Sequence, residues 1–241
     1  MPRRNRVDPW GDLNAVADRG LFTGNRGCLV NDDRQLARHH RGSLWIICLL
    51  EYRGWHHELD APSVWTPVFF LDEAVALAAG HRPCGLCRRD AYLAYRSAVA
   101  ASAPHSLDGS TPQATTLNRS LQRERLHRLD RRGRGRGPFL ERYADRILLS
   151  MPIGEVPTGA VVLGGDDKPH LVIDGGLQRF SFAGWQEPVP SPDAGSVVAV
   201  LTPATSLAAL HHGYRPRLHP SAAVAEPTTG PLGEAPDAVA V

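Results

Sequence analysis

The spacing of apolar and polar positions predicts strands and turns first, followed by two helices. Residues 44–50 form an unbroken apolar run with β-branched and aromatic members, which predicts a buried strand. A hairpin is expected over residues 20–40, around the turn-forming cluster at 31–33, and a short strand is expected at 68–70. Residues 72–79 predict a helix, because alanine and leucine fill its turns, Asp72 can cap its start and Gly80 can close it.

The same patterns continue along the rest of the chain. A second helix is expected over 88–103, where Tyr92, Tyr95 and Val99 share one face, and a third begins near residue 115. From residue 153 the pattern changes to short apolar runs between Gly/Asp turns, which predict strands at 160–163, 170–173, 177–182 and 197–201. A short helix is expected at 205–211. These elements predict an α+β fold with a small sheet and two helices in an N-terminal module and a mostly-β C-terminal module.

Composition divides the chain into four parts. We expect an N-terminal module over 1–103, a linker and arginine-rich helical segment over 104–152, a small mostly-β module over 153–220, and a disordered tail over 221–241. No apolar run approaches the roughly 20 residues of a membrane helix. The basic N-terminus lacks the apolar core of a signal peptide, so a cytoplasmic protein without membrane contact is expected.

The four cysteines carry the clearest chemistry. Cys84 and Cys87 form a C-x2-C pair, a spacing that lets two thiolates bind one tetrahedral Zn²⁺ ion. Cys48 and Cys28 are expected to complete a four-cysteine site. Nearby histidines could replace either of them, namely His39, His40, His56, His57 and His81. A redox pair is disfavoured, because a thioredoxin-like motif lies between a strand and the start of a helix, whereas this pair follows a helix.

The stretch "VFFLDEAVALAAGHRPCGLCRRD" resembles the end of the metal-binding domain of the Ada DNA-repair family. The matching positions are Phe69, Phe70, Glu73, Ala74, Ala78, Ala79, Gly80, Arg82, Pro83, Cys84 and Cys87, and His81 stands where the family has an aromatic residue. The resemblance implies a zinc site with four ligands. In the Ada protein one thiolate also accepts a methyl group from a DNA phosphotriester. The family's closely spaced first cysteine pair is absent here, since Cys28 and Cys48 lie far apart, so a structural site is favoured.

An arginine-rich segment suggests a nucleic-acid partner. Residues 117–142 hold nine arginines against three acidic residues, a charge of +6, whereas the whole chain carries +2. Arginine binds phosphate well, so contact with DNA or RNA is expected, although a solvated linker would have the same composition. The candidate contacts are Arg88, Arg89, Arg123, Arg131, Arg132, Arg134 and Arg136.

These features favour a zinc-binding protein with a structural site that associates with nucleic acid. One alternative is an enzyme, either an Ada-like methyl acceptor or a hydrolase with its site between the modules. Another is a non-catalytic protein–protein adaptor. The sequence has no GxxxxGK[ST], HExxH or GxSxG motif, so no catalytic residue is assigned.

Overall fold

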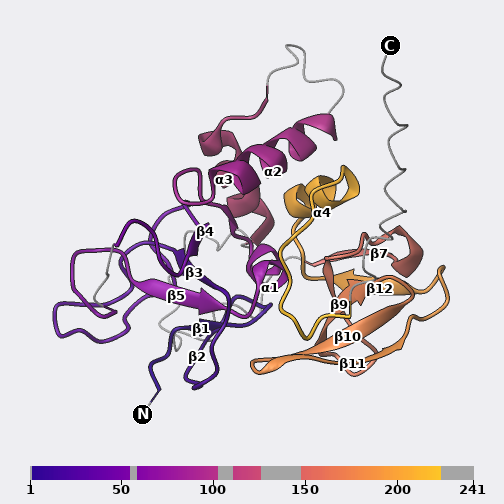
Figure 1. The fold of residues 1–241 in the computed structure, drawn as a ribbon, viewed down its shortest axis with the longest axis horizontal. Helices are drawn as coiled ribbons and strands as arrows, with labels where there is room; N and C mark the ends of the chain where they lie inside the picture. The colour runs from indigo at the N-terminus through magenta and orange to yellow at the C-terminus, as the bar shows by residue number, and fades with distance from the viewer. Residues whose placement is uncertain (1, 55–58, 103–110, 126–147, 224–241) are drawn as a thin grey trace, which may run out of the picture.

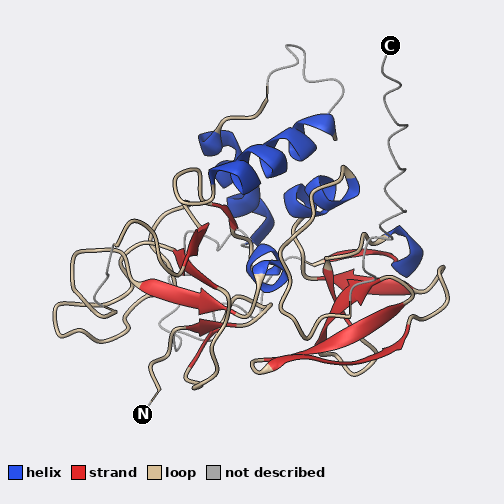
Figure 2. Ribbon diagram, viewed as in Figure 1, coloured by secondary structure: helices blue, strands red, loops and turns tan. Residues whose placement is uncertain are grey.

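Two six-stranded sheets flank a group of helices in the computed structural model of the chain (Figures 1 and 2). The structure describes residues 2–54, 59–102, 111–125 and 148–223. Within these ranges there are four α-helices, and α1 lies between the two sheets (Figure 1). The expected mixed α+β class is therefore confirmed.

The first sheet is built from the N-terminal part of the chain. Its strands are β1 (Arg6–Val7), β2 (Leu13–Asn14), β3 (Phe22–Asn25), β4 (Ile46–Leu49), β5 (Pro67–Phe70) and β6 (Arg82–Pro83), in the order β2-β1-β5-β3-β4-β6. β3 lies antiparallel between β4 and β5. Because side chains alternate between the faces of a strand, Phe22, Ile47, Val68 and Phe70 all point into the core, where each is at most 1% exposed.

The expected hairpin over residues 20–40 forms only around its turn. Val30 and Leu36 make an isolated antiparallel bridge, and the Asn31 and Ala37 N–H groups donate to the carbonyls of Gln35 and Leu29, whereas residues 22–25 pair with other strands. The chain turns after β3, where the Asn25 side chain accepts the Gly27 N–H and Gly27 has a φ of 93°. Both edges of β3 are then taken by the more apolar strands β4 and β5.

Helix α1 (Glu73–Ala78) forms as expected. The Asp72 carboxylate accepts the Val75 N–H at 3.0 Å and caps the first turn. Gly80 follows the helix with a φ of 82°. A Cβ at this position would lie 2.3 Å from the Arg125 side chain, so the position favours glycine. Every residue of α1 is buried, because the helix lies between the two sheets (Figure 1). α2 (Arg89–Ala101) and α3 (Ala114–Arg125) follow in the positions expected for helices.

The second sheet contains the strands expected from the Gly/Asp turns. β8 (Val161–Leu163), β9 (Pro169–Ile173), β10 (Gly176–Ser181) and β12 (Val197–Val200) are confirmed, as is α4 (Ala204–His211). Two strands were not expected, β7 (Leu149–Pro152), which a 3-10 turn (Ile153–Glu155) follows, and β11 (Gly184–Pro190). β11 contains prolines at 188 and 190, and it tolerates them because it is the edge of the order β11-β10-β9-β8-β12-β7.

Asp72 connects the two sheets. Besides capping α1, its carboxylate accepts the indole N–H of Trp185 in β11 at 2.6 Å and the backbone N–H of His219 at 3.0 Å. Asp72 is fully buried, and burial raises the pKa of its carboxyl group while these N–H donors oppose the rise. The start of α1 is therefore held by groups from the far end of the chain.

Glu73 adds a second set of bonds at the same place. Its two carboxylate oxygens accept both guanidinium Nη atoms of Arg88, at 2.8 and 2.7 Å. It also accepts the Tyr214 hydroxyl and, at 2.9 Å, the backbone N–H of Arg217. Nearby, α2 packs on α4, where the Tyr95 and Ser206 hydroxyls lie 2.9 Å apart. One continuous hydrophobic core includes residues of both sheets.

The start of the expected tail takes part in this structure. The Ser221 hydroxyl accepts the backbone N–H of Trp185 at 2.8 Å. The backbone N–H of Ala223 donates to the side-chain oxygen of Gln178 at 2.7 Å. Residues 224–241, which make up the rest of the expected tail, lie outside the described residues.

The substitution Asp72→Ala should lower the free energy of unfolding by about 3 kcal/mol, because it removes a helix cap and leaves the buried indole N–H of Trp185 without its acceptor. Urea denaturation measures the change. Asp33→Ala, at an exposed position, is the matched control and should change stability by no more than about 0.5 kcal/mol. Equal effects of the two substitutions would contradict the role of Asp72.

Candidate metal centre

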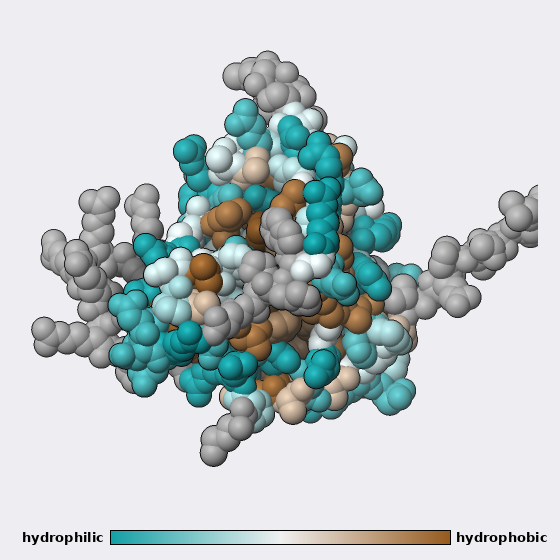
Figure 3. All heavy atoms as spheres, turned by 60° about the vertical axis from the view of Figure 1, so that its left-hand side comes forward, coloured by the Kyte–Doolittle hydropathy of each residue, from teal (hydrophilic) through white to brown (hydrophobic). Residues whose placement is uncertain are grey.

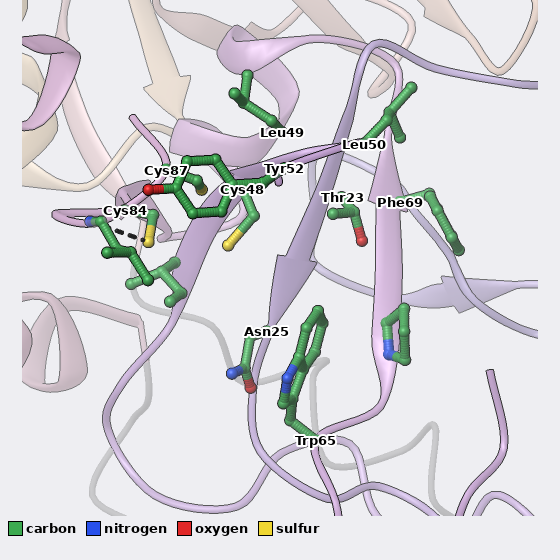
Figure 4. A pocket seen from close by; sticks show the side chains of 13 residues that line it. Thr23, Asn25, Cys48, Leu49, Leu50, Tyr52, Trp65, Phe69, Cys84 and Cys87 are labelled. Atoms are coloured by element: carbon green, nitrogen blue, oxygen red, sulfur yellow. Dashed lines mark hydrogen bonds between the residues drawn. The ribbon is translucent and has the colours of Figure 1, made fainter. Parts of the chain in front are cut away.

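Three cysteines come together beside the first sheet. The sulfur atoms of Cys48, Cys84 and Cys87 all lie within 4.8 Å of one another. Cys48 is in β4, and the other two lie in the turn between β6 and α2 (Figure 4). Sulfurs that share a tetrahedral Zn²⁺ at about 2.3 Å are roughly 3.8 Å apart, so the three need only small movements to bind one ion.

Pairing of β4 with β6 places the turn against Cys48. The two strands run parallel, with Ile47 opposite Pro83, and the Cys84 N–H donates to the Ile47 carbonyl at 2.9 Å. The first cysteine of the turn therefore lies next to the strand that carries Cys48. Inside the turn, the Leu86 N–H points at the Cys84 sulfur, 3.4 Å away (Figure 4). Such N–H groups stabilise thiolates in metal-binding turns.

The three thiols cannot all ionise easily without a cation. Hydrogen bonds from the Cys48 and Cys87 thiols lower the pKa of Cys84. Hydrogen bonds with Cys84 and Cys87, together with burial, raise the pKa of Cys48. The three thiols therefore oppose one another's ionisation, and a divalent cation would favour the loss of their protons.

Cys28 is not part of this cluster. Its thiol is buried and lies 3.4 Å from the Val30 carbonyl oxygen, to which it donates. The structure therefore brings together three of the four expected cysteine ligands. Among the described histidines, His39, His40 and His81 also lie outside the cluster. His56 and His57 fall outside the described residues.

His81 and His39 belong to a separate buried cluster around Arg26. The Arg26 guanidinium donates to the imidazole of His81 at 3.1 Å and lies 2.6 Å from an imidazole nitrogen of His39. Burial, reinforced by Arg26, lowers the pKa of both histidines well below the ordinary value. The ring of His81 also packs on Phe70 and Trp45, with centroids 4.7 and 5.1 Å away. His81 therefore packs as an aromatic ring in the core of the first sheet.

All three cysteines line a pocket of about 300 Å³ on the outer face of the first sheet. Strand alternation explains the lining, because one face of β3, β4 and β5 presents Thr23 and Asn25, Ile46 and Cys48, and Pro67 and Phe69. Leu49, Leu50, Tyr52, Trp65 and Leu86 complete the wall (Figure 4). Sequence reasoning missed these residues, because only the register of the three strands brings them together.

Hydrophobic side chains reach the surface beside the pocket. Elsewhere too, hydrophobic groups appear at the surface among hydrophilic ones, as the space-filling view of one face shows (Figure 3). Leu50 and Leu86, which line the pocket, are 55% and 56% exposed. Exposed apolar side chains beside a pocket are typical of ligand-binding surfaces.

The expected nucleic-acid contacts divide into three groups. Arg88 is engaged in the ion pair with Glu73, and its side chain is only 7% exposed, so it is not available to a phosphate. Arg89 and Arg123 are exposed at the start of α2 and the end of α3. Arg131, Arg132, Arg134 and Arg136 lie outside the described residues.

In the part of the chain that the structure describes, no helix combines the length and apolar character needed to cross a bilayer.

The purified protein should contain about one zinc ion per chain, and Cys48→Ser, Cys84→Ser and Cys87→Ser should each lower this content, because each removes one of the three clustered sulfurs. Cys28→Ser is the matched control and should keep the wild-type content. Elemental analysis of the four variants measures the effect. Loss of zinc in Cys28→Ser but not in Cys48→Ser would overturn the assignment.

Comparisons with known proteins add no further information on this centre. The chain matches no family model, no curated protein and no solved structure significantly. The likeness to the Ada-type metal-binding domain therefore stays an expectation that rests on the residues of the turn.

Proposed function

We propose that this protein binds one Zn²⁺ ion through Cys48, Cys84 and Cys87, and that the ion has a structural role. The observation that carries the proposal is the approach of the three sulfurs to within 4.8 Å of one another. Thiolates are soft ligands that select zinc, copper(I) or iron–sulfur clusters. Zinc is favoured because a C-x2-C turn with N–H groups aimed at its sulfurs is the usual zinc-binding turn.

The position of the cluster supports a structural role. An ion held there joins the middle of β4 to the turn that leads into α2. The residue after Cys87 is Arg88, whose guanidinium binds the Glu73 carboxylate between the two sheets. Fixing this turn therefore also fixes the arginine that ties α2 to the start of α1. A metal at this point stabilises more of the fold than the turn itself.

We also propose that the protein associates with nucleic acid through its arginines. Arg119 and Arg123 are both exposed and lie one turn apart on α3, directly before the segment richest in arginine. Two guanidinium groups on one helix face can bind neighbouring phosphates. Arg89 adds a further exposed positive charge at the start of α2.

Removal of zinc should lower the melting temperature of the wild-type protein by about 10 °C, because bound metal stabilises the folded state by a few kcal/mol and each kcal/mol shifts a domain of this size by about 2–4 °C. Differential scanning calorimetry before and after treatment with a strong chelator measures the shift. The Cys84→Ser/Cys87→Ser variant should melt like the chelated protein and should not respond to zinc. An unchanged melting temperature on chelation would refute the structural role.

Binding to duplex DNA should weaken steeply with salt, and Arg119→Ala/Arg123→Ala should reduce the slope of log affinity against log salt by about 2, since each lost phosphate contact removes about 0.9. Fluorescence anisotropy of labelled DNA measures both quantities. Arg179→Ala, which removes an arginine from the second sheet, should leave the slope unchanged. If the wild-type protein does not bind DNA or RNA at low salt, the nucleic-acid proposal is wrong.

A further inference from the structure

The cysteine cluster faces a pocket, whereas a closed structural site would be surrounded by protein. Each of the three sulfur ligands belongs to a residue that lines the pocket of about 300 Å³. Zinc takes four ligands, and a site with three protein ligands keeps one coordination position for water or a bound molecule. The described residues supply three ligands at this centre. The geometry therefore directs the fourth position toward the pocket.

The charge of the site restricts what can occupy it. The described residues that line the pocket include no Asp, Glu, Lys, Arg or His. A Zn²⁺ ion with three thiolates carries a net charge of −1, so the centre repels anions and the wall offers no cation to offset this. Phosphate and carboxylate groups are thus poor ligands for this pocket.

A cationic guest is also disfavoured. The aromatic ring of Phe69 is an obvious place for a cation, but the Arg6 guanidinium already lies 4.5 Å from its centroid. A cationic group has no lone pair with which to complete the coordination of zinc. A neutral molecule with a lone pair avoids the repulsion of an anion and can still complete the coordination of zinc.

The walls of the pocket suit a flat ring. Tyr52 lies near the cysteines, and Trp65 lies beside Asn25 at the other end of the pocket (Figure 4). Aromatic walls favour planar guests through stacking. The volume is at the lower end of ligand pockets, which run from about 300 to 1,000 Å³, so it suits one or two fused rings.

Polar groups on β3 can orient such a ring. The Asn25 side-chain oxygen accepts the Gly27 N–H at 2.7 Å, which fixes the amide and leaves its NH₂ group as a donor. The Thr23 hydroxyl donates to the Val68 carbonyl at 2.9 Å, so its oxygen remains an acceptor. β3 thus offers the pocket one donor and one acceptor in addition to the aromatic and aliphatic side chains of its wall.

We infer that the pocket binds a neutral heteroaromatic molecule of one or two rings, and that an unprotonated ring nitrogen of this molecule occupies the fourth coordination position of the metal held by Cys48, Cys84 and Cys87. This inference rests on the proposed zinc site. It adds a ligand-binding function to a centre for which a structural role alone is otherwise proposed. Imidazole-type nitrogen is a common zinc ligand, so the chemistry is compatible with the ion.

The experiment uses the full-length protein with Co²⁺ in place of Zn²⁺, because the visible absorption of Co²⁺ reports its ligands. Sulfur-to-cobalt charge-transfer bands show that the thiolates hold the metal. Benzimidazole is then titrated as the neutral two-ring probe. It should shift the d–d bands saturably, whereas inorganic phosphate at the same concentration should leave them unchanged.

Variants locate the probe in the pocket. Trp65→Ala should weaken benzimidazole binding about tenfold through loss of a stacking surface, and Trp65→Phe should restore most of the affinity. Val64→Ala is the matched control, since Val64 is exposed, adjoins Trp65 and does not line the pocket; it should have no effect. Circular dichroism confirms that each variant is folded, and Trp65→Leu, which keeps an apolar side chain but removes the ring, supplies the test if Trp65→Ala does not fold.

The outcomes separate the two proposals. Absence of charge-transfer bands would show that the thiolates hold no metal, and the proposed zinc site itself would fail. Charge-transfer bands together with d–d bands that benzimidazole does not shift would show that the fourth position is closed to it, and only the present inference would fail. A shift of the d–d bands by phosphate would overturn the proposed class of ligand. An equal response to benzimidazole in the wild type and in the Trp65 variants would overturn the pocket as the binding site.

Discussion

Two adjacent buried carboxylates at the start of α1 hold the two sheets in their relative position. Asp72 accepts the α1 cap bond together with the Trp185 indole and the His219 backbone, while Glu73 accepts Arg88 and groups near the end of the chain. Buried carboxylates are tolerated only when donors compensate for the lost water, and here those donors come from α1, from the residue before α2, from β11 of the second sheet and from the segment after α4. The carboxylates therefore require both halves of the chain to fold together, which agrees with the single continuous core.

The cluster of three cysteines depends on this arrangement. The turn that carries Cys84 and Cys87 is fixed at one end by the pairing of β4 with β6 and at the other by the Arg88–Glu73 ion pair. The tertiary contacts on both sides of the turn thus hold the thiols close together, which lowers the ordering cost of binding an ion there. The same arrangement leaves the sulfurs on the outer face of the sheet, where a pocket opens in front of them. A stabilising ion and an accessible coordination position are compatible in this geometry.

Elements specified by neighbouring residues were predictable from the sequence. α1 has its cap, its apolar turns and its terminating glycine within nine residues, and the Gly/Asp turns separate β8, β9 and β10 clearly. Elements that depend on distant partners were not predictable from the sequence. The expected hairpin of residues 20–40 forms around its turn, but β3 at its start pairs with β4 and β5. β11 was missed because its prolines argue against a strand, and only its edge position makes them acceptable.

The sequence by itself determined the C-x2-C turn, the helices beside it and the α+β class, since each depends on contacts within a few residues. Only the tertiary structure decided that Cys48 joins this turn while Cys28 donates to Val30, since both cysteines have apolar neighbours and look alike in the sequence. It also decided that Arg88 binds Glu73 rather than remaining exposed, and that residues of three strands form one pocket. The reason is that strand register and the burial of charge depend on partners far away in the chain, and local patterns carry no information about which partners meet.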